Sequence, residues 1–152
     1  MAYAIIDEVE IVRLGPADVD KVIAARDLFD REPVSDSTAR FLVEPGHHLL
    51  FAYDGDVPVG FISGVETVHP DKGAEMFLYE LGVAESHRRR GVGRALIQRL
   101  ANIARAAGCY GMWVATEAEN IAALAAYEAA GAKREDEPAV ILTWKFRPPA
   151  QR

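Results

Sequence analysis

The chain has 152 residues, of which 50% are hydrophobic and 26% are charged. This length and balance predict a single domain over residues 1–152 and exclude a disordered or collagen-like chain. The only cysteine, Cys109, cannot form an internal disulfide, so a disulfide scaffold is excluded as well.

The charge balance narrows the partners. The chain has 17 Lys and Arg against 23 Asp and Glu, a net charge of −6. Proteins that coat phosphate backbones usually carry the opposite sign, so we expect no nucleic-acid partner. No apolar run approaches the ~20 residues of a membrane span, and residues 1–7 lack the features of a secretory signal. We therefore expect a cytoplasmic protein with no membrane partner.

Hydrophobic periodicity predicts the first elements. Residues 9–14 alternate as a strand does, and apolar residues at near-helical spacing predict a helix over residues 16–31. A shorter helix is expected over residues 35–43. Two strands follow over residues 48–53 and 57–68, joined by an Asp54-Gly55 turn of type I′, and residues 75–83 form the next strand.

The second half changes to a helical period at Gly91, and that helix ends at Gly108. We then expect a strand over 110–116, an Ala-rich helix over 120–130 and a last strand over 139–146, with one more short strand around 132–134 left open. In the last strand Val140, Leu142 and Trp144 share a face that is either core or interface. The order β-α-α-β-β-β-α-β-α-β predicts an α+β (mixed α/β) domain, with a mostly antiparallel, twisted sheet of about six or seven strands and flanking helices.

The most informative stretch is LYELGVAESHRRRGVGRAL, residues 78–96. A strand ends there, three arginines follow, and a helix begins at Gly91-Val92-Gly93. The start of a helix has unpaired backbone N–H groups and the positive end of the helix dipole. Glycine lets a phosphate approach that backbone closely, so the stretch predicts a cradle for a diphosphate.

Other interpretations of this stretch remain open. Gly91-x-Gly93 is half of a dinucleotide-binding turn, but Leu96 stands where that turn needs glycine or alanine. The arginines could form a nucleic-acid patch, against which the acidic balance argues, or an ordinary solvated loop. A P-loop is excluded because neither Gly-Lys-Ser nor Gly-Lys-Thr occurs.

Two motifs resemble the GNAT acetyltransferase superfamily. RRRGVG over residues 88–93 resembles its acyl-CoA-binding signature, and NIAALAAYEAAG over residues 120–131 resembles its second conserved segment. The predicted order of elements fits from about residue 9 to residue 147, so the resemblance covers nearly the whole chain. It implies a GNAT-like fold, acetyl-CoA as co-substrate and N-acetyltransferase activity.

The N-terminal half is similar to the aminoglycoside 3-N-acetyltransferase group. RLGP at 13–16, DLFDRE at 27–32 and LYEL at 78–81 carry this similarity, with Glu80 where the group has aspartate. The resemblance implies acetyl transfer to an aminoglycoside amine by direct attack in a ternary complex, with antibiotic resistance as a consequence. The alternatives are a protein amine, a polyamine or another small metabolite as acceptor, and a binding module that senses acyl-CoA without turnover.

Glu80 is a carboxylate in an otherwise apolar strand, and strict alternation places it on the face of Met76 and Leu78. It is a salt-bridge partner, a water-facing edge residue, or a general base with a raised pKa that takes a proton from the acceptor's ammonium. The resemblance implies the last role, with Tyr127 as the general acid for the departing thiolate. Without the resemblance, Tyr127 is better explained as an aromatic side chain packed on the sheet.

The resemblance also implies which residues bind acyl-CoA. Gly82 marks a bulge, a close backbone approach or tight packing. Asn120 is a pantetheine contact, a helix N-cap, or both. The expected acyl-CoA-binding residues are Leu81, Gly82, Val83, Arg88, Arg89, Arg90, Gly91, Val92, Gly93, Arg94, Ala95, Asn120, Ala123 and Tyr127.

Carboxylates are the candidates for holding a polycationic acceptor. They are Asp30, Glu32, Asp36, Glu135 and Asp136. Cys109 is rejected as an acyl-carrying nucleophile because no histidine is adjacent to it. The four histidines lack the spacing of metal ligands, so no metal is expected. Members of the superfamily are frequently dimers, which leaves a homodimer open.

Overall fold

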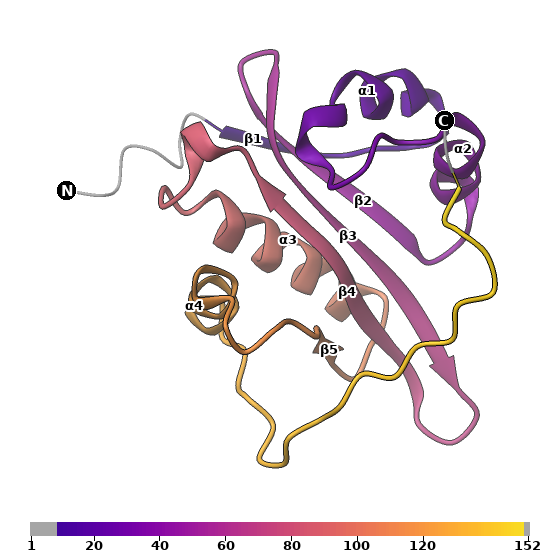
Figure 1. The fold of residues 1–152 in the computed structure, drawn as a ribbon, viewed down its shortest axis with the longest axis vertical. Coiled ribbons are helices and arrows are strands. Elements are labelled where there is room, and N and C mark those ends of the chain that lie inside the picture. The colour runs from indigo at the N-terminus through magenta and orange to yellow at the C-terminus, as the bar shows by residue number, and fades with distance from the viewer. Residues whose placement is uncertain (1–8, 151–152) are drawn as a thin grey trace.

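A computed structural model describes residues 9–150 as one sheet with helices on both faces (Figure 1). The five strands lie in chain order, and the first four are antiparallel neighbours. They are β1 (Val9–Arg13), β2 (His47–Asp54), β3 (Val57–His69), β4 (Gly73–Val83) and β5 (Met112–Trp113). β5 pairs in parallel with β4 over two residue pairs only, Met76 with Met112 and Phe77 with Trp113.

Helices cover both faces of the sheet. They are α1 (Val19–Ala24), α2 (Ser35–Val43), α3 (Val92–Ala106) and α4 (Ile121–Ala129), with 3-10 turns at Pro16–Asp18, Arg26–Leu28 and Glu85–His87. Figure 1 shows α1 and α2 on one face and α3 and α4 on the other. α3 buries Val92, Leu96 and Leu100 against β2, β3 and β4, as its apolar stripe predicted. The second core cluster joins Phe51 and Phe61 of the sheet to Val22 of α1 and Leu42 of α2.

Two local predictions in the first half are wrong. The helix expected over 16–31 ends as an α-helix at Ala24, and Phe29 has extended backbone with φ −98° and ψ 151°. The Phe29 ring stacks on Phe61 with centroids 4.2 Å apart, so tertiary packing overrides the local helical pattern. The hairpin loop is Gly55-Asp56, and only Gly55 has a positive φ, 59°. Glycine with positive φ at the first central position is the pattern of a type II′ turn, not type I′.

The strands expected in the second half are shorter or missing. The strand over 110–116 is reduced to β5, and residues 132–134 and 139–146 form no strand. The sheet therefore has five strands within residues 9–150 instead of six or seven. Val140, Leu142 and Trp144 belong to neither core cluster and are 82%, 75% and 75% exposed. Alternation gives residues 139–146 an apolar face, but a strand also needs a neighbouring strand that pairs with its backbone. β5, as such a neighbour, has only two residues to pair with.

Candidate active site

The edge of β4 is open beyond the point where β5 ends. Ala84 N–H donates to the Val59 carbonyl of β3 at 2.8 Å. Because backbone groups alternate in direction along a strand, those of Val83 and Leu81 face away from β3. The Val83 carbonyl accepts a hydrogen bond from Arg88 Nε at 3.1 Å instead. Leu81 and Val83, which the resemblance implies as acyl-CoA-binding residues, therefore lie where β4 has no neighbouring strand on its outer side among residues 9–150.

The start of α3 presents free backbone donors. Its first helical hydrogen bond runs from Ala95 N–H to the Gly91 carbonyl at 3.0 Å, so the amides of residues 92–94 have no backbone acceptor within residues 9–150. Gly91 is the N-cap with φ 82°, a left-handed conformation that favours glycine, and no side chain caps the helix. These donors and the helix dipole form a site suited to an anion.

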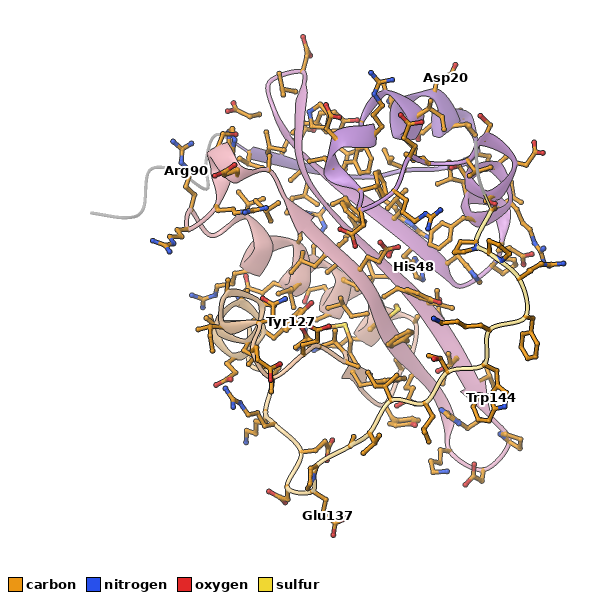
Figure 2. The ribbon with its side chains drawn as sticks, viewed as in Figure 1. Asp20, His48, Arg90, Tyr127, Glu137 and Trp144 are labelled. Carbon is orange, nitrogen blue, oxygen red and sulfur yellow. The ribbon has the colours of Figure 1, made fainter. Side chains whose placement is uncertain are left out.

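The surroundings of this helix start are open and positively charged. A Cβ added to Gly93 would meet only Val83 Cγ2 at 3.7 Å and Leu81 Cδ2 at 3.8 Å, so space remains above its backbone. Arg89 and Arg90 are exposed and form no ion pair with the described residues. Figure 2 shows Arg90 projecting outward from the loop that precedes α3. The charge and the free amides together fit a diphosphate.

A histidine ties this loop to the sheet. His87 Nε2 lies 2.8 Å from Asp54 Oδ2, at the end of β2, and His87 Nδ1 lies 2.7 Å from Ser86 Oγ. The adjacent residues His87 and Arg88 therefore anchor the loop to β2 and to β4. No local sequence pattern indicates the His87 contact, because its partner lies 33 residues away.

The start of α4 confirms the N-cap alternative for Asn120. Asn120 Oδ1 accepts a hydrogen bond from Ala123 N–H at 3.2 Å, so Asn120 is the N-cap. Tyr127 is buried in the cluster that α3 forms with the sheet, and Figure 2 shows it on the inner side of α4. Its hydroxyl forms no hydrogen bond within residues 9–150, and burial raises its pKa. The ring is packed and the hydroxyl keeps its proton, as a general acid requires.

A β-bulge changes the direction of Glu80. Ser63 of β3 is opposite Glu80, but the next residue, Gly64, is opposite Leu78, so Tyr79 is an extra residue without a partner. Glu80 consequently leaves the face of Met76 and Leu78, where alternation had placed it, and lines a pocket on the α1 side of the sheet. That prediction of a shared face is wrong, although the residue singled out lies in a pocket.

The pocket has a volume of about 180 Å³. Its lining residues are Leu28, Asp30, Phe61, Tyr79, Glu80, Leu81 and Gly82. The Glu80 side chain is exposed to solvent, yet partial desolvation by the pocket raises its pKa, and the negative charge of Asp30 raises it further. Two carboxylates thus face one small cavity, one of them with a raised proton affinity.

Gly82 is a packing glycine. A Cβ there would lie 2.6 Å from Phe61 Cε1 and 2.9 Å from the Leu28 carbonyl oxygen. The bulge that glycine suggested lies at Tyr79 instead. Gly82 therefore lets the segment after α1 close against β4, which forms the pocket floor.

The remaining candidates are not brought together. Asp30 is the only one of the five carboxylates proposed for the acceptor that lines the pocket. Asp36 is exposed in the first turn of α2, and Glu135 and Asp136 are exposed after α4.

Burial and the charge of Glu66 raise the pKa of Cys109, which disfavours a thiolate nucleophile. Within residues 9–150 no cluster of His, Cys, Asp and Glu could hold a metal ion.

Comparison with known proteins identifies the family. A family model described as the acetyltransferase (GNAT) family matches residues 20–132. The chain belongs to this family. The protein is accordingly an N-acetyltransferase, and the open β4 edge and the start of α3 lie in the segments that first suggested the resemblance. Within the described part of the chain, no helix is long and apolar enough to span a bilayer.

Solved structures share the fold of this acetyltransferase. An aminoglycoside acetyltransferase from an uncultured soil metagenomic sample, meta-AAC0020, in complex with sisomicin, matches with a TM-score of 0.85 at 20% identity, over 94% of this chain and 99% of that chain. The aminoglycoside N-acetyltransferase AAC(6')-Iy in complex with CoA matches with a TM-score of 0.75 at 21% identity, over 91% and 95%. A ribosomal-protein-alanine N-acetyltransferase from Brucella melitensis matches with a TM-score of 0.73 at 20% identity, over 90% and 99%. The 3-N position of transfer stays a prediction.

Proposed function

We propose that this acetyltransferase transfers the acetyl group of acetyl-CoA to a primary amine of an aminoglycoside, at the 3-amino group, by direct attack in a ternary complex. The observation that carries the proposal is the pocket beside the open edge of β4. Glu80 and Asp30 both line this pocket, and the negative charge of Asp30 acts on Glu80. A cytoplasmic location, expected from the sequence, is part of the same proposal. The soil acetyltransferase with bound sisomicin supports this class of acceptor.

The residues that would hold acetyl-CoA lie along one path. The amides of residues 92–94 and the arginines of residues 88–90 would bind its diphosphate, and the backbone of Leu81 and Val83 would pair with its pantetheine. Asn120 and Ala123 lie at the start of α4, the other helix on that face. Acetyl-CoA supplies an acetyl group activated as a thioester.

The chain's own groups would manage the protons. An amine is protonated near neutral pH and cannot attack until it loses that proton. Glu80, with its raised proton affinity, would accept the proton directly or through a water, while Asp30 attracts the cation into the pocket. Tyr127 would donate its hydroxyl proton to the sulfur that leaves. Holding both substrates in one cleft would supply much of the acceleration.

A thiol-release assay tests this proposal. Purified enzyme and acetyl-CoA are offered aminoglycosides, polyamines and peptides with a free N-terminus, and the position of transfer is read from the acetylated product. We expect aminoglycosides to stimulate release most. Preference for the peptide, the acceptor class that the Brucella neighbour suggests, would replace the aminoglycoside by a protein amine. Binding of acetyl-CoA without release for any amine would favour an acyl-CoA sensor instead.

The mechanism has its own test. Glu80→Gln keeps the size of the side chain and removes the base, so kcat should fall about 100-fold or more while the affinity for acetyl-CoA stays unchanged. Asp20→Asn is the control, because it removes an exposed carboxylate of α1 that lies outside the pocket and is not a candidate for binding the acceptor. Equal effects of both substitutions would remove Glu80 from the base role.

A further inference from the structure

The acceptor pocket is smaller than a multi-ring acceptor requires. Its volume of about 180 Å³ lies below the range of about 300–1,000 Å³ that is usual for sites holding drug-sized ligands. Such a pocket accommodates the reacting amine and part of its ring. The rest of a larger acceptor must lie on the surface that continues from the pocket wall.

An aromatic row continues from that wall. Tyr79 lines the pocket, its ring centroid is 4.9 Å from that of Phe77, and Phe77 stacks on Trp113 with centroids 4.2 Å apart. Tyr79 is 60% exposed and Trp113 is 46% exposed. The row runs from the pocket, across β4, to the short edge strand β5.

The fold does not account for this exposure. On the same side of the sheet, Phe51 and Phe61 are buried by α1, α2 and the segment between them. The aromatic row lies outside that cluster and outside the cluster under α3. Exposed apolar surface that is continuous with a pocket commonly marks a ligand-binding surface.

The bulge explains why the row meets the carboxylates. Without the extra residue, Tyr79 and Glu80 would point to opposite faces of the sheet. With the bulge, both line one pocket, so the aromatic row and the two carboxylates form one continuous surface. Aromatic faces attract cations, and Asp30 and Glu80 attract them as well.

We propose that Tyr79, Phe77 and Trp113 form a second acceptor subsite, which holds an ammonium-bearing ring of a multi-ring amine while another amine of the same molecule lies at Glu80. This inference rests on the proposed function, because it names the kind of acceptor that the site prefers. The subsite selects substrates with at least two amino-bearing rings over single-ring amines.

The test compares a large and a small acceptor. Trp113→Leu keeps an apolar side chain but removes the aromatic face. We expect the KM for sisomicin, a multi-ring aminoglycoside, to rise about 3- to 30-fold with little change in kcat, in line with cation–π attractions at exposed to desolvated sites. The KM for glucosamine, which has one ring, should stay within about twofold, since it ends before the row. Trp144→Leu, at the other tryptophan, is the matched control and should change neither value.

A binding measurement covers the case in which Trp113→Leu fails to fold. In Trp144→Phe the only remaining tryptophan is Trp113, so its fluorescence reports directly on the row. Titration with sisomicin should change the emission saturably, and glucosamine should not. An unchanged KM for sisomicin, an equal rise for both amines, or a flat titration would overturn the subsite. If no amine is acetylated, the proposed function fails, and the titration then decides the subsite by itself.

Discussion

The same substitution at two glycines of the α3 start should have opposite effects on stability. Gly91 has a φ of 82°, and a non-glycine residue in the left-handed region costs about 1–2 kcal/mol. Gly93 lies inside the first turn, where its Cβ would find nothing closer than 3.7 Å. Alanine there removes up to about 1 kcal/mol of the backbone entropy penalty that glycine carries in a helix.

These free energies translate into small shifts of the melting temperature. For a chain of this length, 1 kcal/mol corresponds to about 2–4 °C. Gly91→Ala should therefore lower Tm by about 2–8 °C, and Gly93→Ala should leave it unchanged or raise it by up to about 4 °C. Differential scanning calorimetry of the two variants without ligand measures both.

Ligand binding should reverse the ranking for Gly93. If the diphosphate rests on the amides of residues 92–94, a methyl group on Gly93 occupies the space above them. Losing one hydrogen bond between an amide and a charged oxygen costs about 1.5–3 kcal/mol, so the Kd for acetyl-CoA should rise about 10- to 100-fold. Isothermal titration calorimetry checks this on a variant whose fold is intact. A Gly93→Ala protein that binds acetyl-CoA as the wild type does would refute the diphosphate cradle.

Three further substitutions probe the pocket and α4, which lies on the other face of the sheet. Glu80 has a raised pKa, so its ionised form destabilises the folded state above that pKa, and this destabilisation disappears as the pH falls through it. Glu80→Gln should therefore raise Tm at about pH 8 and leave Tm unchanged at about pH 3, which thermal melts at both pH values measure. Asp30→Asn removes the negative charge beside Glu80, which lowers the Glu80 pKa and moves the acidic limb of the pH profile of kcat/KM to lower pH. If the acidic limb stays at the same pH in this variant, the two carboxylates do not interact. Tyr127→Phe keeps the packed ring and removes a hydroxyl that has no hydrogen-bond partner among the described residues, so Tm should stay unchanged while kcat falls about 100-fold. Unchanged turnover in stopped-flow thiol release would exclude the role of Tyr127 as general acid.

Local rules were sufficient for the segment proposed to bind the co-substrate. Gly91 and Gly108 bound α3 because both positions need a positive φ, 82° in each case, and the apolar spacing between them fixes the buried stripe. Asn120 caps α4 for an equally local reason. These features depend on residues within one or two helical turns, and such information is present in the sequence.

The pocket proposed for the acceptor depends on contacts between distant residues, and its details were not predictable from the sequence. The extra residue at Tyr79 shifts the register against Ser63 and Gly64, and nothing in the local pattern indicates it. Phe29 leaves the helical path because Phe61 receives its ring. Residues 139–146 alternate as a strand does, yet pairing requires a neighbour with a free edge of matching length. Asp30 was nonetheless among the candidates, because carboxylates are the expected partners of a polycationic acceptor.

Because Gly82 has no side chain, the segment between α1 and α2 packs closely on β4, and this segment can vary independently of the helices on the other face of the sheet. The Leu28 carbonyl lies 2.9 Å from the position where a Cβ would stand, so the segment between α1 and α2 packs directly on β4, on the face opposite α3 and α4. Replacement of residues 26–34 by the equivalent stretch of another family member would then change the floor of the proposed acceptor pocket and leave the start of α3 unchanged. A library built in that stretch, with Gly82 fixed, is a direct route to enzymes that acetylate new amines from an unaltered donor.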